Sequence, residues 1–132
     1  MIVLDTSAAL SCLVSRSPDA ALVTRVAEAS SVHVPHLIDV EFVSALRGLV
    51  RGSKLTVDRA RDALTDFIDL RLVRYPVTGL MLPMWARRDS LTAYDAAFVC
   101  LAEALDCPLV TCDRRLARGS SESLVELFPP ND

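Results

Sequence analysis

The chain has 132 residues, the size of one domain, and 52% of them are hydrophobic, enough to bury a single sizeable core. With 23% charged residues, this composition excludes a disordered or fibrous chain. The net charge of -3 argues against binding of nucleic acid through bulk positive charge, and acids interrupt the apolar runs, so we expect neither a membrane span nor a signal peptide.

The N-terminal part of the chain predicts two strands, each followed by helix. Residues 1–4 are a short apolar run without alternation, which is typical of a buried parallel strand. The Asp5-Thr6-Ser7 cluster that follows is a good helix cap, and residues 8–14 read as helix. A second helix begins at Ser17-Pro18-Asp19, with Pro18 near its first position, and residues 32–34 form the second strand.

Two helices are expected in the middle of the chain. Residues 37–50 predict a long helix, in which Leu37, Val40, Glu41 and Ala45 share one face with helical spacing. We expect that face to be turned to the core, which places Glu41 among apolar side chains. Thr56 caps the next helix.

The C-terminal half continues the alternation of strand and helix. A strand at 72–75 precedes a short helix within 78–86, where Pro83 is an unfavourable residue. Thr92 caps a helix that runs to Leu105, and strand 109–111 leads to a short helix opened by Asp113. With a possible fifth strand at 124–127, the pattern predicts an α/β fold, a parallel sheet of 4–5 short strands with helices on both faces, as one domain over 1–132.

Four acids stand where burial is expensive. Asp5 and Asp113 follow strands, Asp95 lies in the first turn of its helix, and Glu41 has no Lys or Arg three or four residues away. Acids after parallel strands lie at the sheet edge where open α/β sheets bind ligands. Taken singly, Asp5, Asp95 and Asp113 read equally well as helix caps or favourable N-terminal charges.

Together the same acids indicate a metal site. Four carboxylates in one pocket cannot all ionise without a compensating cation, and a set of oxygen ligands suits Mg²⁺ or Mn²⁺ rather than zinc. The four cysteines have no zinc-ligand spacing, and we interpret them as reduced thiols of a cytoplasmic protein.

Four segments carry a family resemblance. Residues 1–8 (MIVLDTSA), 35–37 (PHL) with Glu41, 91–97 (LTAYDAA) and 109–117 (LVTCDRRLA) resemble, in order, the motifs of PIN-domain nucleases. Among these, the chain is most similar to VapC toxins of VapBC toxin–antitoxin pairs. All four motifs in order, across nearly the whole chain, make the resemblance specific, although each motif alone is weak.

The resemblance implies a PIN-like three-layer α/β/α fold and a Mg²⁺- or Mn²⁺-dependent endoribonuclease. Asp5, Glu41, Asp95 and Asp113 would form the catalytic metal site, with Asp5 and Asp95 as primary ligands. The adjacent threonines, Thr6 and Thr111, would support the acids or water by hydrogen bonds. The implied partners are RNA, a VapB-like antitoxin and a second copy in a homodimer.

Arginines near the acid motifs predict contacts to RNA phosphates, although a solvated arginine face accounts for them about equally well. They are Arg87, Arg88, Arg114, Arg115 and Arg118. Low aromatic content and the lack of an RNA-recognition aromatic motif give no sign of base stacking.

Three other functions share some of these features. A phosphoacceptor receiver domain needs paired acids after the first strand and a Lys after a late strand, but only Asp5 follows the first strand and Lys54 follows a helix. A haloacid-dehalogenase-type phosphatase needs a second Asp two residues after Asp5, where Ser7 stands. A non-catalytic PIN-like module that binds RNA or protein remains the alternative, disfavoured by the intact acids.

Overall fold

The computed structural model describes residues 1–120 and 124–129. Its centre is a sheet of five parallel strands in the order β3-β2-β1-β4-β5. The strands are β1 (Ile2–Leu4), β2 (Val32–Pro35), β3 (Leu72–Tyr75), β4 (Leu109–Thr111) and β5 (Val125–Leu127). The predicted α/β class, the parallel sheet and the fifth strand are confirmed.

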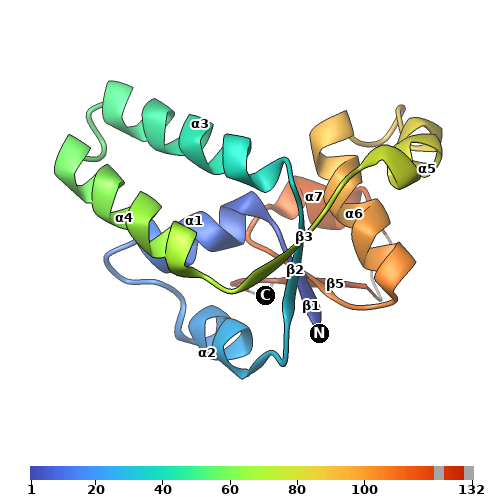
Figure 1. Cartoon of the computed structure of the whole chain (residues 1–132), viewed down its shortest axis with the longest axis horizontal. Coiled ribbons are helices and arrows are strands. Elements are labelled where there is room, and N and C mark those ends of the chain that lie inside the picture. Colours follow the sequence, from blue (N-terminus) through green and yellow to red (C-terminus); the bar gives the residue numbers. More distant parts are fainter. Residues whose placement is uncertain (121–123, 130–132) are drawn as a thin grey trace.

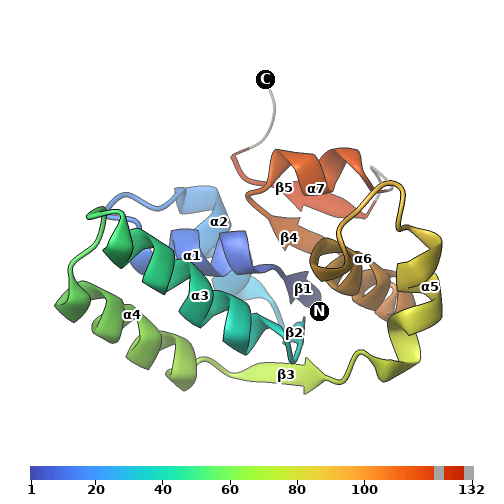
Figure 2. The same cartoon turned by 90° about the horizontal axis from the view of Figure 1, so that it is seen from above.

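Helices cover the sheet on both sides. They are α1 (Thr6–Val14), α2 (Ala20–Glu28), α3 (Ile38–Arg51), α4 (Val57–Asp69), α5 (Met81–Ala86), α6 (Ala93–Leu105) and α7 (Arg114–Arg118), with a 3-10 turn η1 at Thr78–Leu80. Helices α1 to α4 lie together on one side of the strands, and α5 and α6 lie on the other (Figures 1 and 2). This layering buries every residue of β1 and β4, and Ile2, Val3 and Val110 are each 0% exposed.

The order of the strands decides where a site can form. From β1 the chain builds outward through β2 to β3, and then returns to place β4 on the other side of β1. The strand order therefore switches direction between β1 and β4. The crevice at the carboxyl ends of such a strand pair is the usual ligand site of open α/β sheets. Asp5 and Asp113 follow these two strands.

Local capping explains where the helices begin. Asp5, Asp19, Thr56, Thr92 and Asp113 each precede a helix and accept a hydrogen bond from a backbone N–H in its first turn. These bonds satisfy N–H groups that otherwise have no partner in the helix. The second helix begins at Ala20 behind the Asp19 cap, so Pro18 precedes the cap and does not stand near the first helical position.

Helices α3 and α4 form a hairpin whose buried face differs from the predicted one. The buried side chains of α3 are Ile38, Phe42 and Leu46, and Phe42 stacks on Phe67 of α4 with ring centroids 4.2 Å apart. Val40, predicted to face the core, is 74% exposed. The predicted face is wrong because packing against α4 buries the neighbouring row of side chains instead.

In the described residues, 1–120 and 124–129, no helix is long and apolar enough to span a membrane.

Candidate active site

Asp5 is the buried centre of the site, with 6% of its surface exposed. It caps α1 by accepting a hydrogen bond from the Ala8 N–H at 2.9 Å. Its carboxylate also accepts hydrogen bonds from the Thr111 hydroxyl at 2.6 Å and from the Ser7 hydroxyl at 2.8 Å. Burial raises the pKa of Asp5 to about 6, because desolvation outweighs these hydrogen bonds and the charge of Asp113 adds to it.

Two hydroxyl groups join the ends of β1 and β4. Thr111 donates to Asp5 while its oxygen accepts the Asp113 N–H at 2.9 Å. Ser7 donates to Asp5 while its oxygen accepts the Cys112 N–H at 3.0 Å. The acid after β1 is thus fixed relative to the backbone that carries Asp113, which is what a site built from separate strands needs.

Glu41 enters the site from the first turns of α3. Its carboxylate accepts a hydrogen bond from the Thr6 hydroxyl at 2.8 Å, across 35 residues of sequence. Partial burial raises the pKa of Glu41, and the charge of Asp95 raises it further. Glu41 therefore lies in an environment that disfavours its charge and interacts with Asp95, although α3 buries a different face; its role in a metal site stays a prediction.

Asp95 and Asp113 complete the group of acids. Burial raises the pKa of Asp95, its hydrogen bond with Thr92 lowers it, and the charges of Asp113 and Arg115 act in opposite directions. Asp113 accepts the Arg115 backbone N–H at 2.9 Å, and the Arg115 guanidinium lies 3.5 Å from the same carboxylate oxygen. Asp95 thus interacts electrostatically with an acid from α3 and with the acid after β4.

The four acids are linked by pairwise electrostatic interactions and do not form a closed group of metal ligands. Glu41 interacts with Asp95, Asp95 with Asp113, and Asp113 with Asp5. Among residues 1–120 and 124–129, no three His, Cys, Asp or Glu side chains are grouped closely enough to hold a metal ion. The donor chemistry nevertheless fits Mg²⁺ or Mn²⁺, because all four groups are carboxylates and both ions prefer oxygen ligands.

The arginines predicted to contact RNA are placed differently from one another. Arg115 reaches the acids, and Arg115 and Arg118 line a small polar hollow of about 400 Å³ with Ser90. Arg87 pairs with Glu103 near the far end of α6, and Arg88 lies over the Trp85 ring. Arg114 follows Asp113 at the start of α7. RNA contact by these arginines remains a prediction.

Sequence reasoning did not identify Ser7 as part of the site. The sequence places Ser7 in a helix-capping cluster and in the motif at 1–8 without a role in the site, whereas in the structure its hydroxyl donates to Asp5 and accepts from the Cys112 N–H. The signal was a hydroxyl residue two positions after an acid that ends a buried strand, but only the packing of β4 beside β1 supplies its second partner.

Comparisons with known proteins match nearly the whole chain. The family model described as "PIN domain" matches residues 2–121. The VapC ribonuclease Mb0985 of Mycobacterium bovis (strain ATCC BAA-935 / AF2122/97) is 42% identical over 130 residues, covering 98% of this chain and 99% of its own length.

Two solved structures have a similar fold. PAE2754 from Pyrobaculum aerophilum aligns with a TM-score of 0.69 and 22% identity over 94% of this chain and 81% of its own. VapC20 of Mycobacterium tuberculosis, described as a sarcin–ricin loop cleaving toxin, aligns with a TM-score of 0.62 and 18% identity over 92% of this chain and 98% of its own.

Proposed function

Because the chain belongs to the PIN-domain family, we propose that it is a VapC-type endoribonuclease, the toxin of a toxin–antitoxin pair, which hydrolyses phosphodiester bonds in RNA. The observation that carries this proposal is the raised pKa of Asp5, Glu41 and Asp95, which lie in one electrostatic chain with Asp113. The main cause is burial, with a smaller effect of the neighbouring acids, and buried carboxylates with raised pKa values are expected where a site is built for a cation.

We assign Mg²⁺ or Mn²⁺ to this site, held by Asp5 and Asp95 with Glu41 and Asp113 in support. When bound, such an ion neutralises charge on phosphoryl oxygens and makes water a better nucleophile at neutral pH. The protein's own contribution is orientation: Ser7 and Thr111 fix the Asp5 carboxylate, and Thr6 fixes that of Glu41. Arg115, which lies beside Asp113, would attract the phosphate.

RNA cleavage tests the proposal directly. The purified protein is incubated with transfer and ribosomal RNA in Mn²⁺ or Mg²⁺, with EDTA, and as the variants Asp5→Asn and Asp66→Asn. Asp66 is an exposed carboxylate of α4 outside the site, so its variant is the matched control. We expect cleavage to require the ion and Asp5 but not Asp66. Cleavage that survives both EDTA and Asp5→Asn would refute the assignment.

A non-catalytic RNA-binding module is the second candidate. It is favoured by one observation, the lack in the described residues of three carboxylates grouped closely enough to hold an ion. The two candidates differ in what the same experiment yields. RNA binding without cleavage of any RNA, in either ion, would establish the binding module and reject the nuclease.

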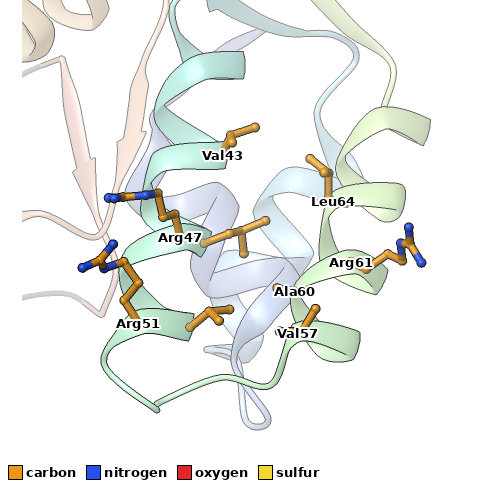
Figure 3. Close-up of a pocket in the computed structure, with 9 residues that line it drawn as sticks. Val43, Arg47, Arg51, Val57, Ala60, Arg61 and Leu64 are labelled. Atoms are coloured by element: carbon orange, nitrogen blue, oxygen red, sulfur yellow. The ribbon is translucent and has the colours of Figure 1, made fainter.

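We further propose that the antitoxin partner places an acidic, amphipathic helix in the groove between α3 and α4. The groove has a volume of about 470 Å³ and an apolar floor that includes Leu46, Val50 and Leu64. Figure 3 shows Arg47 and Arg51 on the α3 side and Arg61 on the α4 side, with their guanidinium groups at the margins. Apolar contacts with a basic margin suit a helix with one apolar face and acidic flanks.

Two substitutions one helical turn apart on α4 test this partner site. Leu64 lines the groove, whereas Ile68 is 67% exposed and does not line it. The antitoxin is the product of the neighbouring reading frame, co-expressed with each toxin variant. We expect Leu64→Glu to abolish the complex and Ile68→Glu to retain it. Equal complex formation by the two variants, with helical content verified by circular dichroism, would place the antitoxin elsewhere.

We also propose that the protein forms a homodimer. Exposed apolar side chains such as Val40 and Val73, 74% and 45% exposed, fit burial in an assembly. Sedimentation velocity of the purified toxin is expected to give twice the mass of the 14.4 kDa chain. A single species at the mass of the chain would exclude the dimer.

A further inference from the structure

Helix α5 and the start of α6 form an apolar hollow beside the acids. The hollow has a volume of about 570 Å³. It is lined by Met81, Leu82, Met84, Trp85, Arg88, Leu91, Thr92 and Ala93. Trp85 is 67% exposed, an unusual position for so large an apolar side chain. An exposed tryptophan in a hollow is a feature that a binding partner explains better than the fold of the chain alone.

A guanidinium group accompanies this ring. The Arg88 guanidinium carbon lies 4.8 Å from the centre of the Trp85 ring, and the same side chain donates to the Trp85 carbonyl at 3.2 Å. The contact orients a positive charge against an aromatic ring at the surface. Among residues 1–120 and 124–129, no ion pair of Arg88 with an acid is found.

The hollow is continuous with the helix that carries Asp95. Its lining ends on Thr92 and Ala93, and the Thr92 hydroxyl accepts the Asp95 backbone N–H at 3.2 Å. Figure 2 shows α5 beside α6, with the connecting segment leading to the start of α6. One turn of α6 therefore separates the hollow from the acidic group, and Tyr94 on that turn is 64% exposed.

We propose that this hollow is a base-binding subsite, in which an unpaired RNA base near the cleaved phosphate stacks on Trp85 and Arg88 neutralises an adjacent phosphate. The inference rests on the proposed ribonuclease function. Proteins that bind single-stranded RNA stack bases on aromatic and guanidinium planes, and every base offers such a face. An aromatic ring, a cation and the neighbouring catalytic acids favour RNA over a purely apolar protein partner.

Trp85 is the single tryptophan of the chain, so its fluorescence reports on the hollow alone. The test uses the full chain carrying Asp5→Asn to prevent cleavage, titrated with a short single-stranded RNA and with the same sequence as a duplex. Stacking predicts quenching by the single strand that saturates, and much weaker quenching by the duplex. Quenching that is equal for both, or absent, would overturn the proposal.

Substitutions at and away from the hollow complete the test. Trp85→Leu keeps an apolar side chain but removes the stacking face, and we expect it to weaken binding of fluorescein-labelled single strand about tenfold. Ile68→Ala, which trims a side chain of equal exposure on α4, is expected to leave the affinity unchanged. Equal affinity of Trp85→Leu and the parent would also reject the subsite.

The outcomes separate this proposal from the ribonuclease assignment and from a role in self-association. If Trp85→Leu retains the affinity while cleavage still requires Asp5, the subsite is wrong and the nuclease stands. If Trp85→Leu loses affinity but no RNA is cleaved, the subsite stands and the nuclease fails. Conversion of Trp85→Leu to a smaller species in sedimentation, with unchanged affinity for RNA, would assign the hollow to a second copy of the chain.

Discussion

Replacing Asp5 by Asn should stabilise the protein at neutral pH when no divalent ion is present. In an unfolded chain an Asp side chain has a pKa of about 3.9, whereas burial raises the pKa of Asp5 in the folded protein to about 6. Because the folded state holds this proton more tightly, the free energy of unfolding decreases as the pH rises through this interval and stays low above it.

The magnitude follows from the size of the shift. A difference of about two pKa units corresponds to roughly 3 kcal/mol of destabilisation by the ionised carboxylate. An amide keeps the shape of the side chain and can still cap α1, but its NH₂ group has to find acceptors among the Ser7 and Thr111 hydroxyls. We therefore expect a net gain of about 2 kcal/mol, roughly 6 °C in Tm for a chain of this size.

Urea unfolding followed by circular dichroism in EDTA measures this gain at about pH 7.5 and about pH 4.5, on either side of the folded-state pKa. The gain should be present at the higher pH and small at the lower pH, where folded Asp5 is already neutral. Asp66→Asn, an exposed control, should change little at either pH. An equal loss of stability at both pH values would show that Asp5 acts only as a cap and hydrogen-bond acceptor.

Three further predictions follow from the same contacts. Ser7→Ala removes the hydroxyl between Asp5 and the Cys112 N–H and should lower kcat for RNA cleavage about tenfold with little change in KM; an unchanged kcat would contradict the positioning role. Phe42→Ala should lower the free energy of unfolding by about 3–5 kcal/mol in a urea titration, because it removes the ring stacked on Phe67 and leaves a cavity. A loss below about 1 kcal/mol would mean that α3 and α4 move together to fill the cavity, so the stacked rings contribute little to stability. At sub-saturating Mn²⁺, cleavage should decline as the pH falls below about 6, since protons compete with the ion for Asp5, whose pKa without metal is about 6; an apparent affinity for Mn²⁺ that is the same at about pH 5 and about pH 8 would exclude Asp5 as a ligand.

The elements that could be predicted were those with a local signal. Strand β1 was recognisable because Ile2, Val3 and Leu4 form an unbroken apolar run that ends in a capping Asp, and α6 because Thr92 caps a long apolar segment. The buried face of α3 had no comparable signal. Val40 and Phe42 are both apolar, so the sequence fits more than one face, and contact with Phe67 of α4 makes the choice.

The same distinction applies to the site. The acids were identifiable because each stands in an apolar segment or ends a strand. The structure shows pairwise electrostatic interactions among them, and their joint action on one ion stays a prediction. The link from Ser7 to the Cys112 N–H depends on β4 lying beside β1, across 105 residues of chain. The exposure of Trp85 depends likewise on how α5 packs, and a low aromatic content gives no information about where a single ring lies.

Binding of Mn²⁺, measured by electron paramagnetic resonance during titration of the purified protein, tests most directly whether the acids act together on one ion. We predict tight binding by the parent protein and by Asp66→Asn, and its loss in both Asp5→Asn and Asp95→Asn, which remove carboxylates from different segments of the chain. Affinity for Mn²⁺ that is the same in the parent and in both site variants would contradict the account.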